Sequence, residues 1–373
     1  MHVLVVPDKF KGSLTALEAA DAIREGLRLH HPDWTVTCRP IADGGEGTAA
    51  LLTNATLGTF TTCTVADPLG RPIEASYGLS GDGRTAFVEL AEASGLHRLT
   101  YQERNPLKTS TFGTGQLIQH ALNSGVAEVV LCLGGSATND AGTGLAAALG
   151  FQFLDAGNRP VYPCGGNLSQ ITHIKRAAIL PALTQVRIRV ACDVTNPLYG
   201  PTGAAHVYAA QKGADARAQR QLDNGLSHIA SLIEQLWDLP VAQEPGSGAA
   251  GGVGFGARVF LNAELVSGFM LVTQYTELEK AVEQCNLIIT GEGKLDSQTM
   301  HGKAIRGIAE LGQRYGKPVV AFCGKLALTQ AQITQLGIQQ AVAISPAHLP
   351  LHEAQRWATT FLTQAVAKAY PAP

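Results

Sequence analysis

A short apolar run that ends in glycine constrains this fold more than any other stretch of the sequence. Val129–Leu133 is continuously apolar, Gly134 and Gly135 follow it, and a small-residue helix is expected from about Leu145. Such a run is typical of a parallel strand covered on both faces. Glycines permit a close backbone approach, and the polar loop Ser136–Asp140 lies at the strand's carboxyl end, where α/β sheets bind ligands. Taken alone, the stretch is explained equally well as a tight turn with a helix cap.

The same order of apolar strand, polar loop and helix recurs at both ends of the chain. Near the amino terminus, Val3–Val6 leads into a loop with Lys11 and Ser13, and the next helix starts with the capping box Thr15-x-x-Glu18. Strands that alternate with helices in this way predict βαβ units around a parallel sheet. The other elements expected here are the strands Val36–Ile41, Leu287–Thr290, Val319–Cys323 and Ala341–Ile344, and one closing helix over Glu353–Tyr370 with Trp357 and Phe361 turned inward.

The middle of the chain follows a different pattern and predicts a second domain. Thr61–Ala66 and Ile73–Leu79 are β-rich runs separated by turn residues, which is typical of a β-hairpin. We therefore expect a doubly wound, Rossmann-like α/β domain with a parallel sheet, formed discontinuously by residues 1–60 and 276–373. An α/β domain that begins with the antiparallel hairpin is inserted between them and covers residues 61–275.

Polar residues follow the predicted strands of both domains at their carboxyl ends. In a parallel sheet these ends lie on one edge, so their loops converge. The inserted domain adds the loop Ser136–Asp140 and also Asp193, which follows the predicted strand Val186–Val190. A cleft lined by carboxylates, lysines and backbone donors suits phosphoryl transfer. The candidate residues of the first domain are Lys11, Ser13, Asp43, Glu46, Glu292, Lys294 and Asp296.

Composition and absent motifs exclude several other classes of protein. A net charge of −2 without a basic run argues against nucleic acid or an anionic membrane as partner, and no stretch approaches the ~18 apolar residues of a membrane span. The seven cysteines form no C-x-x-C pair, so we expect reduced thiols in a cytoplasmic protein. The sequence lacks G-x-x-x-x-G-K-[ST], H-R-D and D-F-G, which excludes ordinary P-loop and protein-kinase sites. It also lacks G-x-S-x-G and H-E-x-x-H, which counts against a serine hydrolase or a zincin.

Gly246–Gly251 matches the dinucleotide-binding pattern G-x-G-x-x-G, but its context argues against that function. The pattern should directly follow a strand, whereas Pro240 and Pro245 in the preceding segment disfavour a buried strand. A glycine-rich flap or hinge is expected instead. A nicotinamide-dependent hydroxy-acid dehydrogenase is therefore only an alternative function, as is a non-catalytic sensor of small anions.

Long motifs, in order along essentially the whole chain, resemble those of the type I glycerate kinases of bacteria. The resemblance implies a two-domain α/β kinase that uses ATP and Mg²⁺ to phosphorylate D-glycerate, by in-line transfer in a cleft between the domains. The usual product is 2-phosphoglycerate, with 3-phosphoglycerate as the alternative. Two positions depart from the family pattern: Lys9, where many members carry serine, and Ala141, where glycine is common. The motifs are Pro7–Ser13, Asp43–Thr48, Gly134–Asp140, Cys192–Leu198, Gly248–Gly252 and Thr290–Thr299.

Within this resemblance each candidate residue receives a role. Asp193 is expected to orient or deprotonate the substrate hydroxyl, and Lys11, also catalytic, to bind the substrate carboxylate or the transferred phosphoryl group. Asp43 and Asp296 are expected to bind Mg²⁺ or a substrate hydroxyl. For all three carboxylates, a structural role in a helix cap or turn is the alternative. Substrate binding is further expected from Ser13, Glu46 and Lys294, and nucleotide binding from Gly134, Gly135, Ser136, Thr138, Asn139, Asp140 and Glu292. The sequence leaves open the domain that holds the adenine and the oligomeric state.

Overall fold

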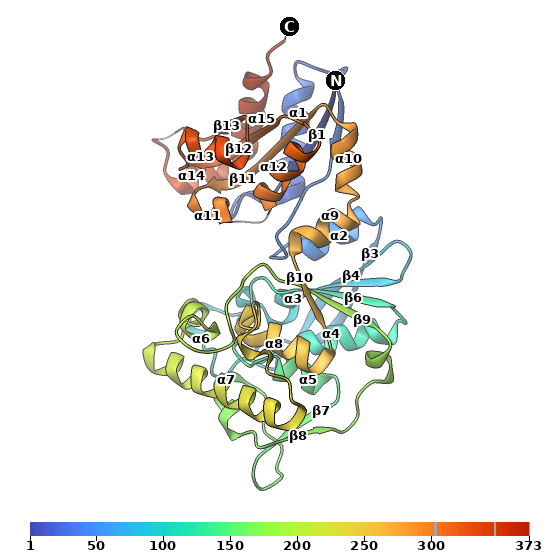
Figure 1. Ribbon diagram of the computed structural model, residues 1–373, viewed down its shortest axis with the longest axis vertical. Coiled ribbons are helices and arrows are strands. Elements are labelled where there is room, and N and C mark those ends of the chain that lie inside the picture. The colour runs from blue at the N-terminus through green and yellow to red at the C-terminus, as the bar shows by residue number, and fades with distance from the viewer. Residues whose placement is uncertain (302–303, 347, 373) are drawn as a thin grey trace. The chain divides into compact units, whose positions relative to one another are not determined.

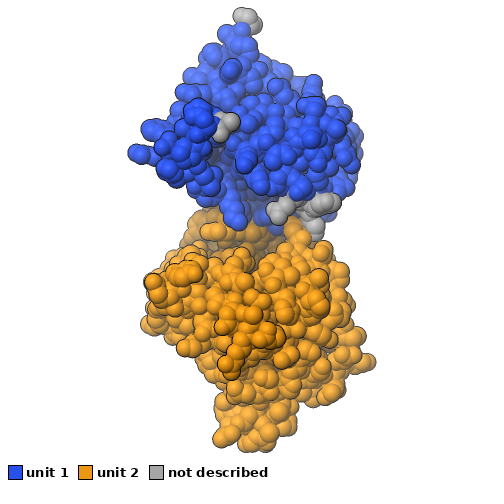
Figure 2. All heavy atoms as spheres, turned by 90° about the vertical axis from the view of Figure 1, so that its left-hand side faces the viewer, with its two compact units in different colours: residues 1–43, 269–373 blue, residues 44–268 orange. Residues whose placement is uncertain are grey.

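The chain folds into two compact units (Figure 2). Each unit is built of helices around a sheet (Figure 1). The computed structural model describes residues 1–301, 304–346 and 348–372. Unit 1 consists of Met1–Asp43 and Phe269–Pro373, and unit 2 of Gly44–Gly268. Both units contain parallel strands connected by helices, which confirms the predicted α/β class.

In its described residues, unit 1 holds a five-stranded sheet in which every neighbouring pair is parallel. The strands are β1 (His2–Pro7), β2 (Thr35–Cys38), β11 (Leu287–Leu295), β12 (Val319–Leu326) and β13 (Gln340–Ala343). Their spatial order is β13-β12-β11-β1-β2. The order runs outward in both directions from the neighbours β1 and β11, as in other doubly wound sheets.

Helices cover both faces of this sheet. α1 begins at the predicted capping box, with Thr15 accepting from the backbone of Glu18 and the Glu18 side chain accepting from the backbone of Thr15. α1 and α15 pack together over Val3 and Val5, while α10 and α12 contact the central strands. The helices of the unit are α1 (Ala16–Arg28), α9 (Gly268–Tyr275), α10 (Leu278–Gln284), α11 (Ser297–His301), α12 (Ala304–Arg314), α13 (Gln330–Leu336), α14 (Leu351–Arg356) and α15 (Ala358–Ala369).

Unit 2 is organised around a mixed sheet with the order β10-β9-β6-β5-β4-β3. The pairs from β5 to β10 are parallel, whereas β3, β4 and β5 are antiparallel, which confirms the predicted hairpin. The strands are β3 (Thr59–Ala66), β4 (Pro72–Leu79), β5 (Thr85–Glu89), β6 (Glu128–Cys132), β9 (Arg187–Ala191) and β10 (Glu264–Val266), and β7 (Phe151–Leu154) pairs separately with β8 (His173–Arg176).

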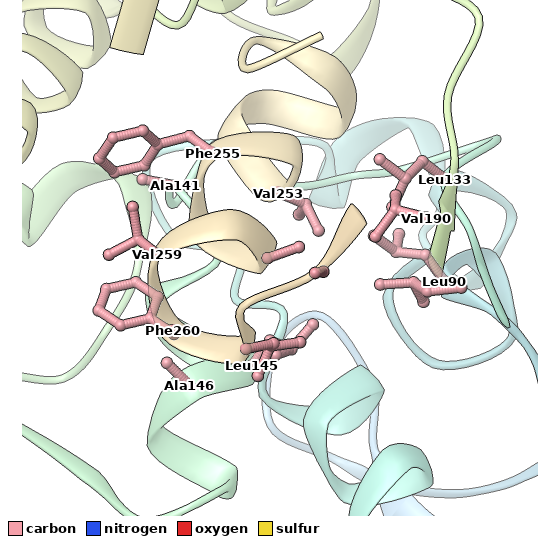
Figure 3. Close-up of a cluster of buried hydrophobic side chains, with 14 of the residues drawn as sticks. Leu90, Leu133, Ala141, Leu145, Ala146, Val190, Val253, Phe255, Val259 and Phe260 are labelled. Carbon is pink, nitrogen blue, oxygen red and sulfur yellow. The ribbon is translucent and has the colours of Figure 1, made fainter. Parts of the chain in front are cut away.

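The core of unit 2 is closed by a helix that is apolar nearly all round. Val253, Phe255, Val259 and Phe260 of this helix, α8, lie among side chains of the segment around α5 (Figure 3). Continuous burial of this kind is expected of a central helix. The helices of the unit are α2 (Thr48–Ala55), α3 (Leu90–Ser94), α4 (Phe112–Asn123), α5 (Thr143–Ala148), α6 (Ala204–Tyr208), α7 (Ala216–Trp237) and α8 (Ala249–Leu261).

The boundaries between the compact units differ from those that the sequence pattern places at 60/61 and 275/276. The chain passes between the units at 43/44 and at 268/269. The first boundary lies earlier because α2 packs against β4 and β5 of unit 2. The sequence indicates a helix that starts near Ala49, but it does not show which sheet that helix covers.

Two further segments differ from expectation. β11 continues from Thr290 to Leu295, since its pairing with β12 extends through Glu292 and Lys294. Residues 246–251 follow a 3₁₀ turn instead of a strand, in agreement with the argument against a dinucleotide site. They are not a flap, however, because Gly251 is buried against the backbone of Thr138.

Candidate active site

The neighbouring strands β1 and β11 mark the point at which the strand order of unit 1 reverses. In open parallel sheets, ligands bind outside the carboxyl ends of the strands at such a switch point. The residues there are 8–14, which follow β1, and the carboxyl half of β11. The register is continuous into this region, since the N–H of Asp8 donates a 2.8 Å hydrogen bond to the carbonyl of Gly291.

Residues 10–14 form a tight turn over the end of β1. The N–H of Phe10 donates to the carbonyl of Leu14 at 2.8 Å, the N–H of Leu14 donates back to Phe10 at 3.0 Å, and both side chains are buried. A Cβ atom at Gly293 would lie 3.0 Å from the backbone nitrogen of Lys11. Glycine at position 293 therefore lets the turn rest directly on β11.

The two predicted residues of this turn have different surroundings. Ser13 Oγ donates a 2.8 Å hydrogen bond to the carbonyl of Gln355 in α14. The amide of Gln355 in turn donates to the carbonyl of Lys11 at 3.5 Å. The Lys11 residue is exposed. The hydroxyl of Ser13 is thus used to fix the turn, whereas Lys11 presents a positive charge to solvent.

Asp8 is the first carboxylate after β1. It is buried, and burial raises the pKa of its carboxyl to about 6, with a further contribution from the negative charge of Asp43. Asp8 Oδ1 accepts a 2.6 Å hydrogen bond from the N–H of Lys9, and Lys9 Nζ lies 3.6 Å from Asp43 Oδ1. The structure thus brings Asp8, Lys9 and the predicted Asp43 together.

β11 carries a second group of charges at its carboxyl end. Burial raises the pKa of Glu292 to about 7, although the hydroxyl of Thr299 donates a 2.8 Å hydrogen bond to Glu292 Oε1. Lys294 Nζ lies 2.6 Å from Asp296 Oδ2. The charges of the nearby carboxylates also raise the pKa of Glu292, so the carboxylates of β1 and β11 form one electrostatic cluster. Its members are Asp8, Asp43, Glu292 and Asp296.

The chemistry of this cluster fits a magnesium ion that arrives with a phosphate ligand. Within the described ranges, no three acidic, histidine or cysteine side chains are placed to hold a metal ion by themselves. In phosphoryl-transfer sites Mg²⁺ is usually bound by one or two carboxylates together with substrate phosphates. Two oxygen ligands of this kind are available in Asp43 and Asp296.

In unit 2, residues 44–47 pack against the carboxyl ends of the strands β6 and β9. A Cβ atom at Gly134, just after β6, would lie 2.5 Å from the backbone nitrogen of Glu46, and one at Gly44 would lie 3.0 Å from Cβ of Ala191. Gly44 also has a φ of 83°, which favours glycine. Glu46 itself is exposed. The glycines in both loops are therefore required for this close approach.

Glu89, the last residue of β5, lies at the same carboxyl edge of the unit 2 sheet. Glu89 Oε1 accepts a 2.8 Å hydrogen bond from the N–H of Gly47. Burial raises the pKa of Glu89 to about 7, and the charges of Glu92 and Glu46 act in the same direction. Glu89 thus ties the 44–47 loop to the sheet through a carboxyl group that resists ionisation.

The loop after β6 is held by backbone pairing and by a buried cation. The N–H of Leu96 donates to the carbonyl of Gly135 at 2.8 Å, so the loop is paired with the segment after α3. Lys212 Nζ donates hydrogen bonds of 2.7 Å to Ser136 Oγ and to the carbonyl of Thr138. Gly135 is exposed and Gly134 partly exposed, whereas Ser136 is 8% exposed. Gly134 and Gly135 therefore form the accessible part of the loop.

Asp140, which was expected to bind the nucleotide, lies in the interior of unit 2. Its fully buried carboxylate accepts hydrogen bonds from the N–H and the hydroxyl of Thr111 at 2.8 Å each, from Gly142 N at 3.1 Å and from Gly144 N at 3.2 Å. Burial raises the pKa of this carboxyl, and those hydrogen bonds oppose the shift. The geometry assigns Asp140 to fixing the loop to α4 and α5.

The adjacent residues Thr138 and Asn139 are also fully buried. The hydroxyl of Thr138 and both polar atoms of the Asn139 amide have no hydrogen-bond partner among the described residues. Buried polar atoms are nearly always satisfied in folded proteins. Orphaned donors and acceptors beside Ser136 and Lys212 fit a loop that binds a polar or anionic ligand.

Asp193 follows β9 at the same edge of the sheet and is partly buried. The segment after it is organised by Asn196, whose amide donates to the carbonyl of Thr202 at 2.8 Å and accepts from the Tyr208 hydroxyl at 2.6 Å. The backbone carbonyl of Asn196 accepts from Gly248 N at 2.9 Å. These hydrogen bonds fix the backbone of the segment that follows Asp193.

Sequence reasoning missed three charged groups of the site: Asp8, Glu89 and Lys212. Asp8 and Glu89 stand at the carboxyl ends of strands, so the rule that selected Asp43 could have found both. Lys212 ends a 3₁₀ turn, Ala210–Lys212, in a stretch that is polar in sequence, and no local signal marks it as buried.

Comparison with known proteins agrees with this arrangement. A model of the glycerate kinase family matches residues 3–371. The chain belongs to the glycerate kinase family. It is 44% identical over 363 residues to a glycerate kinase of Halalkalibacterium halodurans, covering 97% of this chain and 96% of that protein. It is 43% identical over 358 residues to the glycerate 2-kinase of Escherichia coli K12, covering 96% and 94%.

A solved structure supports the same assignment. The crystal structure of a Salmonella typhimurium LT2 protein described as a glycerate kinase 2 superposes with a TM-score of 0.88 at 40% identity, covering 99% of this chain and 97% of that one. As a member of the glycerate kinase family the chain is an enzyme, a phosphotransferase with an alcohol acceptor. No helix among the described residues has the length and apolar character needed to cross a membrane.

Proposed function

We propose that this enzyme transfers the γ-phosphoryl group of ATP to D-glycerate and forms 2-phosphoglycerate. Two observations carry the proposal. Lysines and carboxylates gather at the switch point of unit 1. In unit 2, the loop after β6 holds Ser136, which accepts a hydrogen bond from Lys212. Phosphoryl transfer depends on positioning and on neutralising negative charge, and both groups of residues provide these. The name of the Escherichia coli relative supports the 2-position.

The phosphates of the nucleotide are assigned to the loop after β6. Gly134 and Gly135 offer accessible backbone, and Ser136 offers a hydroxyl that is backed by the ammonium group of Lys212. Thr138 and Asn139 contribute the orphaned polar atoms. Asp140 is left out of this set because its carboxylate already accepts four hydrogen bonds within the fold.

The substrate is assigned to residues that carry exposed or partly exposed charges. Lys11 is exposed, and we assign it to the glycerate carboxylate or the transferred phosphoryl group. Lys294, the partner of Asp296, and Glu46 are further candidates for substrate contacts. Asp193 is assigned to the attacking hydroxyl, which it orients and whose proton it accepts as transfer proceeds. Ser13 supports the Lys11 turn through its bond to Gln355.

Mg²⁺, when bound with ATP, would neutralise charge on the phosphate oxygens. Asp43 and Asp296 are the residues that we propose to hold it, and Glu292 supports this edge through its bond from Thr299. A cytoplasmic location is also proposed, because none of the seven cysteines, all of which lie in the described part of the chain, forms a disulfide.

A coupled assay tests the proposed reaction. The enzyme is mixed with ATP, Mg²⁺ and D-glycerate, and the product is converted by enolase and pyruvate kinase with no mutase present, so that only 2-phosphoglycerate gives a signal. The expected result is pyruvate formation that depends on all three reactants. Formation of ADP without pyruvate would contradict the 2-position, and no ADP above the glycerate-free control would contradict the kinase reaction.

A further inference from the structure

Lys212 is the cation most completely enclosed by unit 2. It is 2% exposed, and the chain turns directly after it at Gly213, which has a φ of 96° and no room for a Cβ beside the carbonyl of Arg104. The ammonium group donates to Ser136 Oγ and to the carbonyl of Thr138, both at 2.7 Å. A buried lysine usually has a charged partner or a function. The hydrogen-bond acceptors here are a hydroxyl and a carbonyl, neither of which is charged.

The bond from Lys212 decides what the hydroxyl of Ser136 can do. A serine hydroxyl has one proton to donate and lone pairs that accept. When an ammonium group donates to the oxygen, the proton of the hydroxyl points elsewhere. Ser136 lies between the accessible Gly135 and the buried Ala137. The loop therefore presents a donor, with a positive charge behind it, and that polarity favours an anionic ligand.

We propose that Lys212 is a positioning residue that turns the Ser136 hydroxyl into a donor and thereby makes the loop after β6 a binding site for the phosphate groups of the nucleotide. This inference rests on the proposed function for the identity of the ligand, but the site itself requires only a polyphosphate anion. Lys212 acts through Ser136 and does not touch the ligand.

The electrostatic surroundings of Lys212 agree with this role. Burial lowers the pKa of Lys212 to about 7, and the carboxylate of Asp140 partly offsets that shift. Keeping Lys212 charged in the folded loop therefore costs free energy, and an anion bound at Ser136 stabilises the charged form of Lys212. Thr138 and Asn139, whose buried polar atoms have no partner in the described residues, lie in the same loop.

Calorimetric titration with ADP and with inorganic tripolyphosphate tests the inference. Lys212→Met removes the donor but keeps most of the side-chain volume, and Ser136→Ala removes the hydroxyl. Each single variant should bind both anions about tenfold to hundredfold more weakly, as expected for the loss of a hydrogen bond to a charged group. The double variant should lose little more, because both changes remove the same interaction. Lys175→Met, at an exposed position of β8, changes the net charge equally and should bind as the wild type does.

Steady-state kinetics separate this role from a merely structural one. The KM for ATP should rise in Lys212→Met and Ser136→Ala while the KM for glycerate stays within about twofold, and n-butylamine should restore ATP binding to Lys212→Ala. Wild-type anion affinity in Ser136→Ala, or additive losses in the double variant, would overturn the inference even if Lys212→Met does not fold. Wild-type protein that binds tripolyphosphate through these residues but transfers no phosphate to glycerate would overturn the proposed function and leave the inference intact.

Discussion

The N–H of Gly47 donates a 2.8 Å hydrogen bond to Oε1 of Glu89, a carboxyl group that lies 7% exposed at the end of β5. Burial, with smaller contributions from Glu92 and Glu46, raises the pKa of Glu89 from 4.5 to about 7. The unfolded chain therefore ionises Glu89 at a lower pH than the folded chain does. The contribution of Glu89 to stability is complete below about pH 4.5 and is lost as the pH rises through about 7.

Glu89→Gln is expected to remove this pH dependence. Glutamine keeps the acceptor for Gly47 but cannot ionise, so the variant should be more stable than the wild type at pH 8 by about 1–3 kcal/mol and equal to it at pH 4.5. Melting temperatures at the two pH values measure the effect. Glu234→Gln, at an exposed position of α7, is the matched control. A destabilised Glu89→Gln at pH 8 would contradict the account.

Gly134→Ala should disrupt the edge of the sheet in unit 2. A Cβ atom there would lie 2.5 Å from the backbone nitrogen of Glu46 and 2.8 Å from the backbone of Gly45, so the loop must shift. Overpacking of this kind typically costs about 1–3 kcal/mol, and we expect a lower melting temperature together with a loss of glycerate kinase activity.

Gly157→Ala is the control for that substitution. Its Cβ would approach only the side chains of Asp155 and Arg159, at 3.3 and 3.5 Å. Its melting temperature and activity should match those of the wild type. If Gly134→Ala behaves in the same way, the close packing of the two loops is not required.

Asp140→Ala should affect stability before it affects ligand binding. The change leaves the buried N–H groups of Thr111, Gly142 and Gly144 without their acceptor, and each such loss costs about 1–3 kcal/mol. Asp215→Ala removes an exposed N-cap that accepts a single bond from Ala218 and should cost only about 1 kcal/mol. Circular dichroism melts of both variants compare the two losses. A well-folded Asp140→Ala that binds ADP weakly would restore Asp140 to the ligand set.

Much of the fold could be predicted because its signals are local. The apolar runs Val3–Val6 and Val129–Cys132 lie in buried strands, and the Thr15–Glu18 capping box starts α1. The closing helix was predicted less well. The helix is interrupted at Trp357, which is 51% exposed instead of turned inward. Phe361 packs against the core as expected, beside the buried Ala358 and Leu362. The apolar spacing of the sequence does not reveal this interruption.

Candidate site residues could be proposed from the sequence only where they follow a strand. Asp43 and Asp193 follow strands and could be selected by that rule. The hydrogen bond from Ser13 to the carbonyl of Gln355, 342 residues away, could not be predicted by that rule. Neither could the bond between Lys212 and Ser136, 76 residues apart, since it depends on long-range packing that leaves no periodic trace.

The most direct test of the strand-end site is the turnover of Asp193→Asn measured beside its melting temperature. Asparagine keeps the shape of the side chain but cannot accept the proton of the substrate hydroxyl. Loss of a group with that function typically lowers kcat about 10²–10⁴-fold. Asp155→Asn, in the turn that directly follows β7, is the control and should retain wild-type kcat. The account predicts a fall in kcat of this size for Asp193→Asn, with the melting temperature and the KM for glycerate little changed. A variant that melts earlier but turns over at the wild-type rate would contradict the catalytic assignment of Asp193.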